Sequence, residues 1–177
     1  MHLFKQEGAI GILEYSTIPQ GMKVLNDIVK RVKLTHIQAK IFPGAKYMIM
    51  MQGEHGSIEY AMEIGIEQEG LFDIGWMGKI HSLMVPVFNE DLYSQDRVEN
   101  VLIFQQTSHA KAFELCNVLL HSFDLRVVQM KYTEALEGQA VVVMSGGVAD
   151  IRGAKEFIKC GEILTNVEPW LFEEVMR

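Results

Sequence analysis

The chain has 177 residues, of which 49% are hydrophobic and 22% charged, a balance typical of a globular protein with a buried core. Its longest apolar runs are far too short to cross a bilayer. The N-terminal sequence MHLFKQEGAIG lacks the apolar stretch and cleavage site of a secretory signal, so we expect a cytoplasmic protein. The net charge is −7 at pH 7, and acidic residues outnumber basic ones in both halves. This charge argues against nucleic acid as a partner.

The sequence contains an internal repeat. Residues 11–40 align without a gap on residues 102–131, and the identical pairs are Ile12/Ile103, Asn26/Asn117, Leu34/Leu125, Gln38/Gln129 and Lys40/Lys131. After a slip of two residues the alignment resumes, with residues 46–64 on residues 139–157. Such self-similarity indicates two copies of one domain. Each copy is small for a stable core, so we expect the two to pack together and stabilise each other. We place these domains at residues 1–97 and 98–177.

Hydrophobic periodicity predicts the same order of elements in both copies. In the first copy it predicts a strand at 9–15, a helix from Ile18 capped by Ser16 or Thr17, strands at 35–42 and 46–52, a helix at 55–68 and a strand near 81–87. In the second it predicts a strand at 100–106, a helix after a Thr107-Ser108 cap, strands at 125–132 and 139–145, a helix at 148–160 and a strand at 162–167. Residues 66–80 have no counterpart and are predicted to form a loop or lid, and residues 169–177 a short amphipathic helix. The order βαββαβ predicts an α+β protein made of two ferredoxin-like sandwiches.

The sequence shows no catalytic constellation, so we do not expect an enzyme. The six histidines are scattered, without an H-E-x-x-H pattern. Cys116 and Cys160 lack C-x-x-C spacing, and two reduced thiols are favoured over a disulfide or a metal site. The carboxylates on and beside the second predicted helix could suggest acid–base chemistry, but a solvated helix face explains them better: Glu54, Glu59, Glu63, Glu67 and Glu69.

Three segments of the first copy carry a family resemblance. They are AIGILEYSTIPQGMKVLNDIVKRVKL, IFPGAKYMIMMQGEHGSIEYAMEIG and the later NEDL. Together they resemble the bacterial microcompartment (BMC) shell proteins, and the two-copy layout resembles the tandem-domain, trimeric class of that family. The resemblance implies a non-enzymatic shell protein, located in the shell of a cytoplasmic microcompartment. It also implies a homotrimer that mimics a hexamer, joins other shell proteins and has a central pore for small metabolites.

The resemblance assigns two kinds of site. The loop between the second and third strands of each copy would line the pore, which gives Ile41, Phe42, Pro43, Gly44 and Ala45 in the first copy and Thr133, Glu134, Ala135, Leu136, Glu137 and Gly138 in the second. The family's edge lysine, which joins neighbouring tiles, maps onto Lys30, and the equivalent place in the second copy is His121.

Phe42 departs from the pattern of a relative that holds an iron–sulfur cluster. That relative has a cysteine immediately before the Pro-Gly of the pore loop, and a phenyl ring cannot replace it as an iron ligand. We therefore predict no cluster, no other metal and no cofactor. Phe42 could form an apolar constriction in three copies, or it could tuck into the subunit interface. Glu134 and Glu137 would make the pore favour neutral or cationic solutes over anions.

A different class of function also fits the predicted fold. A ferredoxin-like oligomeric sensor would bind a small ligand between subunits. Its melting temperature would rise when one specific metabolite is added. A shell protein would instead assemble into sheets or co-purify with other shell proteins.

Overall fold

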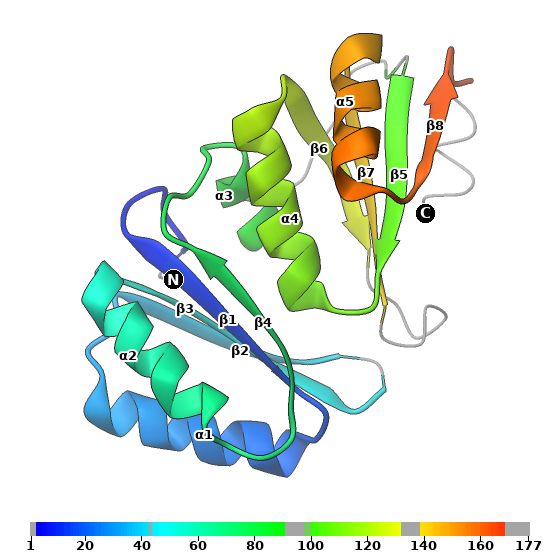
Figure 1. Cartoon of the computed structure of the whole chain (residues 1–177). Helices are drawn as coiled ribbons and strands as arrows, with labels where there is room; N and C mark the ends of the chain where they lie inside the picture. The colour runs from blue at the N-terminus through cyan, green and yellow to red at the C-terminus, as the bar shows by residue number, and fades with distance from the viewer. Residues whose placement is uncertain (1–2, 43, 91–97, 99, 132–138, 169–177) are drawn as a thin grey trace.

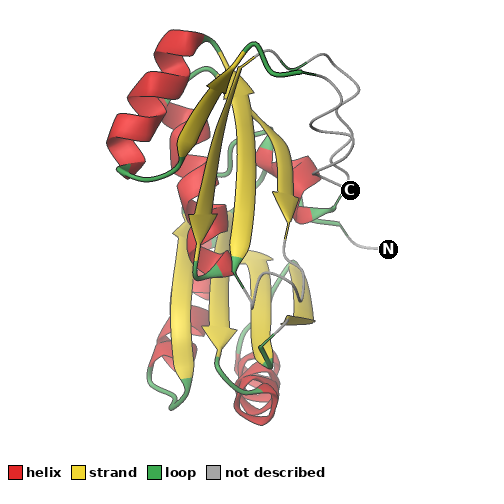
Figure 2. Ribbon diagram, turned by 90° about the vertical axis from the view of Figure 1, so that its right-hand side faces the viewer, coloured by secondary structure: helices red, strands yellow, loops and turns green. Residues whose placement is uncertain are grey.

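The chain forms two four-stranded antiparallel sheets, each with its own helices (Figures 1 and 2). A computed structural model describes residues 3–42, 44–90, 98, 100–131 and 139–168. The strand orders are β2-β3-β1-β4 and β6-β7-β5-β8, so the two repeats have the same topology. This arrangement confirms the predicted tandem α+β fold. The predicted boundary between residues 97 and 98 falls beside residues outside the described ranges and stays a prediction.

The first repeat begins with a strand whose side chains are all buried, β1 (Ala9–Tyr15). It continues with α1 (Ile18–Arg31), β2 (His36–Phe42), β3 (Lys46–Gly53), α2 (His55–Ile66), β4 (Leu71–Met77) and α3 (Met84–Phe88). Val24 and Ile28 bury the inner stripe of α1. Thr17 stands at the N-cap as predicted, but its hydroxyl donates to Gln20 Oε1 at 2.7 Å and accepts no backbone amide of the first turn.

The second repeat follows the same order without a counterpart of α3, and only its last three elements are shorter than those of the first repeat. It consists of β5 (Asn100–Gln106), α4 (His109–Ser122), β6 (Leu125–Lys131), β7 (Ala140–Gly146), α5 (Val148–Ile158) and β8 (Glu162–Thr165). The predicted cap of α4 is confirmed, since Ser108 Oγ accepts the Lys111 amide at 3.0 Å. The amphipathic helix expected at residues 169–177 lies outside the described residues.

The prediction for residues 66–87 was wrong in two places. The expected loop or lid contains strand β4, and the strand expected near 81–87 is replaced by the short helix α3. Met84, Val87 and Phe88 are buried at helical rather than strand spacing. β4 is also the true counterpart of β8, because Gly75 pairs with Ile12 while Glu162 pairs with the aligned Ile103.

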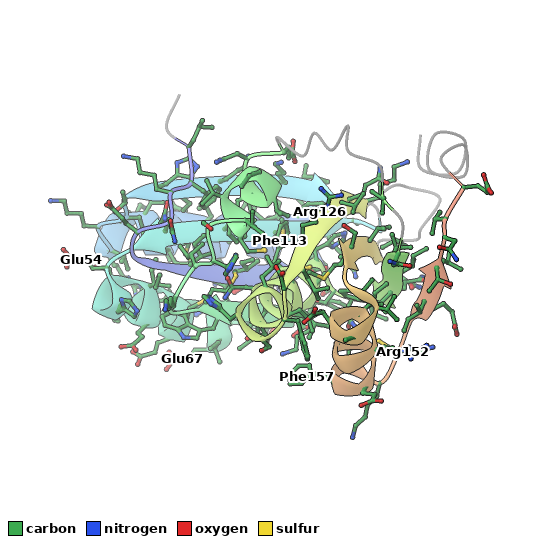
Figure 3. The ribbon with its side chains drawn as sticks, turned by 90° about the horizontal axis from the view of Figure 1, so that it is seen from above. Glu54, Glu67, Phe113, Arg126, Arg152 and Phe157 are labelled. Atoms are coloured by element: carbon green, nitrogen blue, oxygen red, sulfur yellow. The ribbon has the colours of Figure 1, made fainter. Side chains whose placement is uncertain are left out.

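Helix α4 lies between the two sheets (Figure 1). One side covers its own sheet, and the other packs on β1 and β4 of the first repeat. The side that meets the first repeat is a fully or nearly fully buried stripe: Ala110, Phe113, Asn117 and Leu120. Phe113 sits near the centre of the molecule (Figure 3) and stacks on Phe88 with ring centroids 5.3 Å apart. One apolar core therefore runs through both repeats.

Within the described residues, no helix has the length and apolar character required to span a membrane.

Candidate functional site at the junction of the repeats

The turn between β2 and β3 is the described part of the predicted pore loops. Phe42 and Lys46 pair across its base. Gly44 and Ala45 both have left-handed backbones, with φ of +81° and +59°, which reverses the chain sharply. Ile41 is 63% exposed, and Gly44 and Ala45 are exposed as well. Pro43 and the whole second loop, residues 133–138, lie outside the described residues.

Phe42 differs from its exposed neighbours. Its side chain is 3% exposed, and its ring lies against the ring of His109 with centroids 4.2 Å apart. His109 begins helix α4, so the phenyl ring is buried between the two repeats of the same chain. The two expectations for Phe42, a constriction in the pore or a place in the subunit interface, both concern neighbouring chains and stay predictions.

Next to this contact, Glu14 carries a fully buried carboxylate. It lies on β1, on the same face as Ile10 and Ile12, and points at the N-terminus of α4. Its Oε2 accepts the backbone amides of His109 and Ala110 at 2.8 and 3.1 Å and the hydroxyl of Ser108 at 3.2 Å. A carboxylate from the first repeat thereby caps a helix of the second, where free amides and the helix dipole favour negative charge.

Two cationic or titratable side chains complete the cluster around Glu14. His109 Nδ1 and Lys46 Nζ lie 3.2 and 3.3 Å from Glu14 Oε1. Lys46 also donates to the Thr107 carbonyl at 2.8 Å and lies 3.8 Å above the ring of Phe72. Burial by itself raises the pKa of the Glu14 carboxyl, but His109, the Ala110 amide and Lys46 outweigh it and hold that pKa below 4.5. Glu14 is therefore ionised at neutral pH.

The junction acts as a clamp between the two repeats. Glu14, Ser108 and His109 are at most 1% exposed, whereas Lys46 of β3 is 13% exposed and bonds the Thr107 carbonyl just before α4. The acidic residues on and beside α2 are solvated as predicted, since all five glutamates from Glu54 to Glu69 are exposed; Figure 3 shows Glu54 and Glu67. Cys116 is buried in α4 and Cys160 half-buried beyond α5, both as free thiols, and burial raises the pKa of Cys116.

Sequence reasoning missed Glu14, although a signal was present. Glu14 lies two residues after Ile12 and four after Ile10, so its side chain points to the same face of the strand, towards the protein interior. A buried charge needs partners. The partners themselves come from another repeat and could not be named without the fold.

The two predicted edge residues lie at equivalent places with different surroundings. Lys30 is exposed at the end of α1, and His121 is exposed near the end of α4. The ring of His121 stands beside that of His81 from the first repeat. Their roles at a tile edge stay predictions.

Comparison with known proteins agrees with this architecture. Residues 9–74 match the BMC domain family. The bacterial microcompartment shell protein PduT of Citrobacter freundii is 25% identical over 148 residues, which cover 82% of this chain and 80% of that protein. The crystal structure of a microcompartments protein from Desulfitobacterium hafniense DCB superposes with a TM-score of 0.74 at 14% identity, over 93% of this chain and 98% of that one. The match to the BMC domain family therefore lies within the first repeat, and the solved structure shares the fold of the whole chain.

Proposed function

We propose that the protein is a shell protein of a bacterial microcompartment and works as a homotrimeric tile, in which six repeats close into a ring around a pore for small metabolites. The proposal rests on a stripe of residues on α1 that occupies the positions aligned with the buried stripe of α4. The aligned positions on α1 are Pro19, Met22, Asn26 and Val29, and all four are exposed.

The stripe of α1 resembles a contact surface without its partner. Met22 and Val29 are 56% and 50% exposed, whereas the aligned Phe113 and Leu120 are buried, Phe113 against Phe88 of the first repeat. Asn26 aligns with the identical Asn117, which bonds the backbone of Lys79 and His81. A second copy of the chain would cover this stripe in the way that the first repeat covers α4.

The complementary surface is the outer face of the second sheet. Its own helices cover the face that holds Leu102 and Phe104. The opposite face carries a separate apolar cluster, in which Val101 and Val143 are fully buried while Ile103, Val128 and Leu164 are only partly buried. Val101 and Val143 align with Ile10 and Met50 in the intrachain contact. Packing α1 of one chain on this face of the next repeats the intrachain junction between chains, and three chains close the ring with every junction satisfied.

In this ring the β2–β3 turns would surround the axis. Support comes from the exposure of Ile41, Gly44 and Ala45 directly beside the junction of the repeats. We propose that these residues line the opening in the first repeat, with Phe42 packed behind them. Glu134 and Glu137 of the second loop would make it favour neutral or cationic solutes over anions.

We expect the protein to be a trimer in solution and the trimer to depend on α1. Three chains of 20.1 kDa give about 60 kDa by light scattering. Val29→Glu places a charge in the proposed contact and should yield a folded species of about one third of that mass. Tyr60→Glu, on the 47% exposed Tyr60 of α2, is the matched control and should remain trimeric. A wild-type monomer at micromolar concentration, or a Val29→Glu trimer as stable as wild type, would refute the proposal.

A further inference from the structure

Two histidines that are far apart in the sequence meet where the repeats join. His81 follows β4 in the first repeat, and His121 lies near the end of α4 in the second. Their ring centroids are 5.0 Å apart and the rings are nearly perpendicular, at 84°. His121 is exposed and His81 half-buried, so the pair opens to solvent.

Both residues are held by the same short piece of backbone. Asn117, one turn before His121 on α4, accepts the His81 amide at 2.9 Å and donates to the Lys79 carbonyl at 2.9 Å. The Nε2 atom of His121 lies 3.3 Å from that same carbonyl oxygen. The carbonyl can only accept, so in the neutral ring Nε2 carries the proton and Nδ1 keeps a lone pair. An imidazole oriented by a backbone carbonyl is the arrangement that metal-binding histidines use.

His81 is also suited to act as a ligand at neutral pH. Burial, His121 and Lys79 lower the pKa of His81. Its Nδ1 accepts the Leu83 amide at 3.3 Å, a contact at the long end of the hydrogen-bond range. A metal at either ring nitrogen would replace that contact, and the loss of so long a bond costs little. The nearest cation, Lys79, is exposed and can turn its ammonium group towards solvent.

We propose that His81 and His121 form a binding site for a late divalent transition-metal ion, such as Zn²⁺ or Ni²⁺, that links the two repeats. Neutral imidazole is a preferred ligand of these ions. The described residues supply two protein ligands, with no third acidic, histidine or cysteine group nearby. Water, or the same pair from a second copy, fills the remaining positions. Both histidines belong to the same chain, so the proposed metal site does not require the trimer.

The test is isothermal titration of tag-free protein with ZnCl₂ and NiCl₂, because a histidine tag would itself bind the probe. We expect one ion per chain, or one per two chains if two copies share it. His81→Gln and His121→Lys should each raise Kd by at least about tenfold, because even the loss of a group that only orients a ligand has an effect of this size. His121→Lys also gives α4 the residue that α1 has at the aligned position, so we expect it to fold normally.

His55→Gln is the matched control, because His55 is exposed and lies near an aromatic ring, that of Trp76, instead of another histidine. It should bind both ions as wild type does. The proposal is overturned if the wild type binds neither ion or if all three variants bind alike. A monomer that binds zinc through His81 and His121 would leave this site standing while refuting the trimer.

Discussion

Replacing Glu14 with alanine should lower the free energy of unfolding by about 3–5 kcal/mol, the range for removing one partner of a buried charge cluster. The change removes the carboxylate that accepts the His109 and Ala110 amides at the start of α4. It also leaves Lys46 without this ion-pair partner. Urea denaturation at a fixed protein concentration measures the loss. Glu14→Gln should lose less, because its amide oxygen can still accept one of these bonds.

Glu59→Ala is the control for the Glu14 variants. Glu59 is an exposed carboxylate on α2, so its removal should change the unfolding free energy by no more than about 0.5 kcal/mol. If Glu14→Ala were as stable as Glu59→Ala, the cluster would not hold the repeats together.

The contribution of Glu14 should also depend on pH in a defined direction. Its pKa is lowered in the folded protein, so its stabilisation is complete above the unfolded pKa, about 4.3. It is lost as the pH falls through the folded pKa. The stability difference between wild type and Glu14→Gln should therefore shrink as the pH falls below the unfolded pKa. A difference that grows on acidification would contradict a lowered pKa.

Gly75→Ala should destabilise the chain by about 1–3 kcal/mol, the usual range for overpacking. A Cβ atom at Gly75 would stand 2.5 Å from the carbonyl oxygen of Ala110, so α4 would have to move away from β4. That movement would also lengthen the Glu14 contacts. Thermal melting at a fixed protein concentration, followed by circular dichroism, measures the loss.

The matched control for Gly75→Ala is Gly56→Ala in the first turn of α2, where a Cβ atom meets nothing within 4 Å. That variant should be neutral or slightly stabilising, because alanine favours the helix. Equal melting temperatures for the two variants would show that α4 does not depend on its close approach to β4.

Periodicity predicted most of the fold because most elements bury one regular face. The two strands that open the repeats, residues 9–15 and 100–106, have the predicted bounds. Strand β4 was missed because its inward positions include Gly75, whose missing side chain makes room for the α4 backbone. Without an apolar residue there the alternation is weak, and the sequence LFDIGWM does not indicate a strand by itself. The reason for the glycine lies in the other repeat.

The junction was harder to predict for the same reason. Glu14, Phe42 and His109 belong to three elements whose meeting depends on how one repeat sits on the other. Likewise His81 and His121 appear as isolated histidines in the sequence, and only the path of β4 along α4 brings them together. The pore-lining roles of Ile41, Gly44 and Ala45 depend on neighbouring chains and remain a proposal.

The position of α4 also has a consequence for how the protein is made. Chains leave the ribosome from the N-terminus, and domains generally fold in that order. The first repeat can complete its own strands and helices early, but the sheet face formed by Ile10, Ile12 and Met50 lacks the part of its cover that α4 supplies until α4 has been synthesised. During that interval an apolar sheet face is open to other nascent chains, which is a known route to misassembly. Slowing translation between α3 and α4 should therefore reduce the yield of native protein more than slowing it after α4.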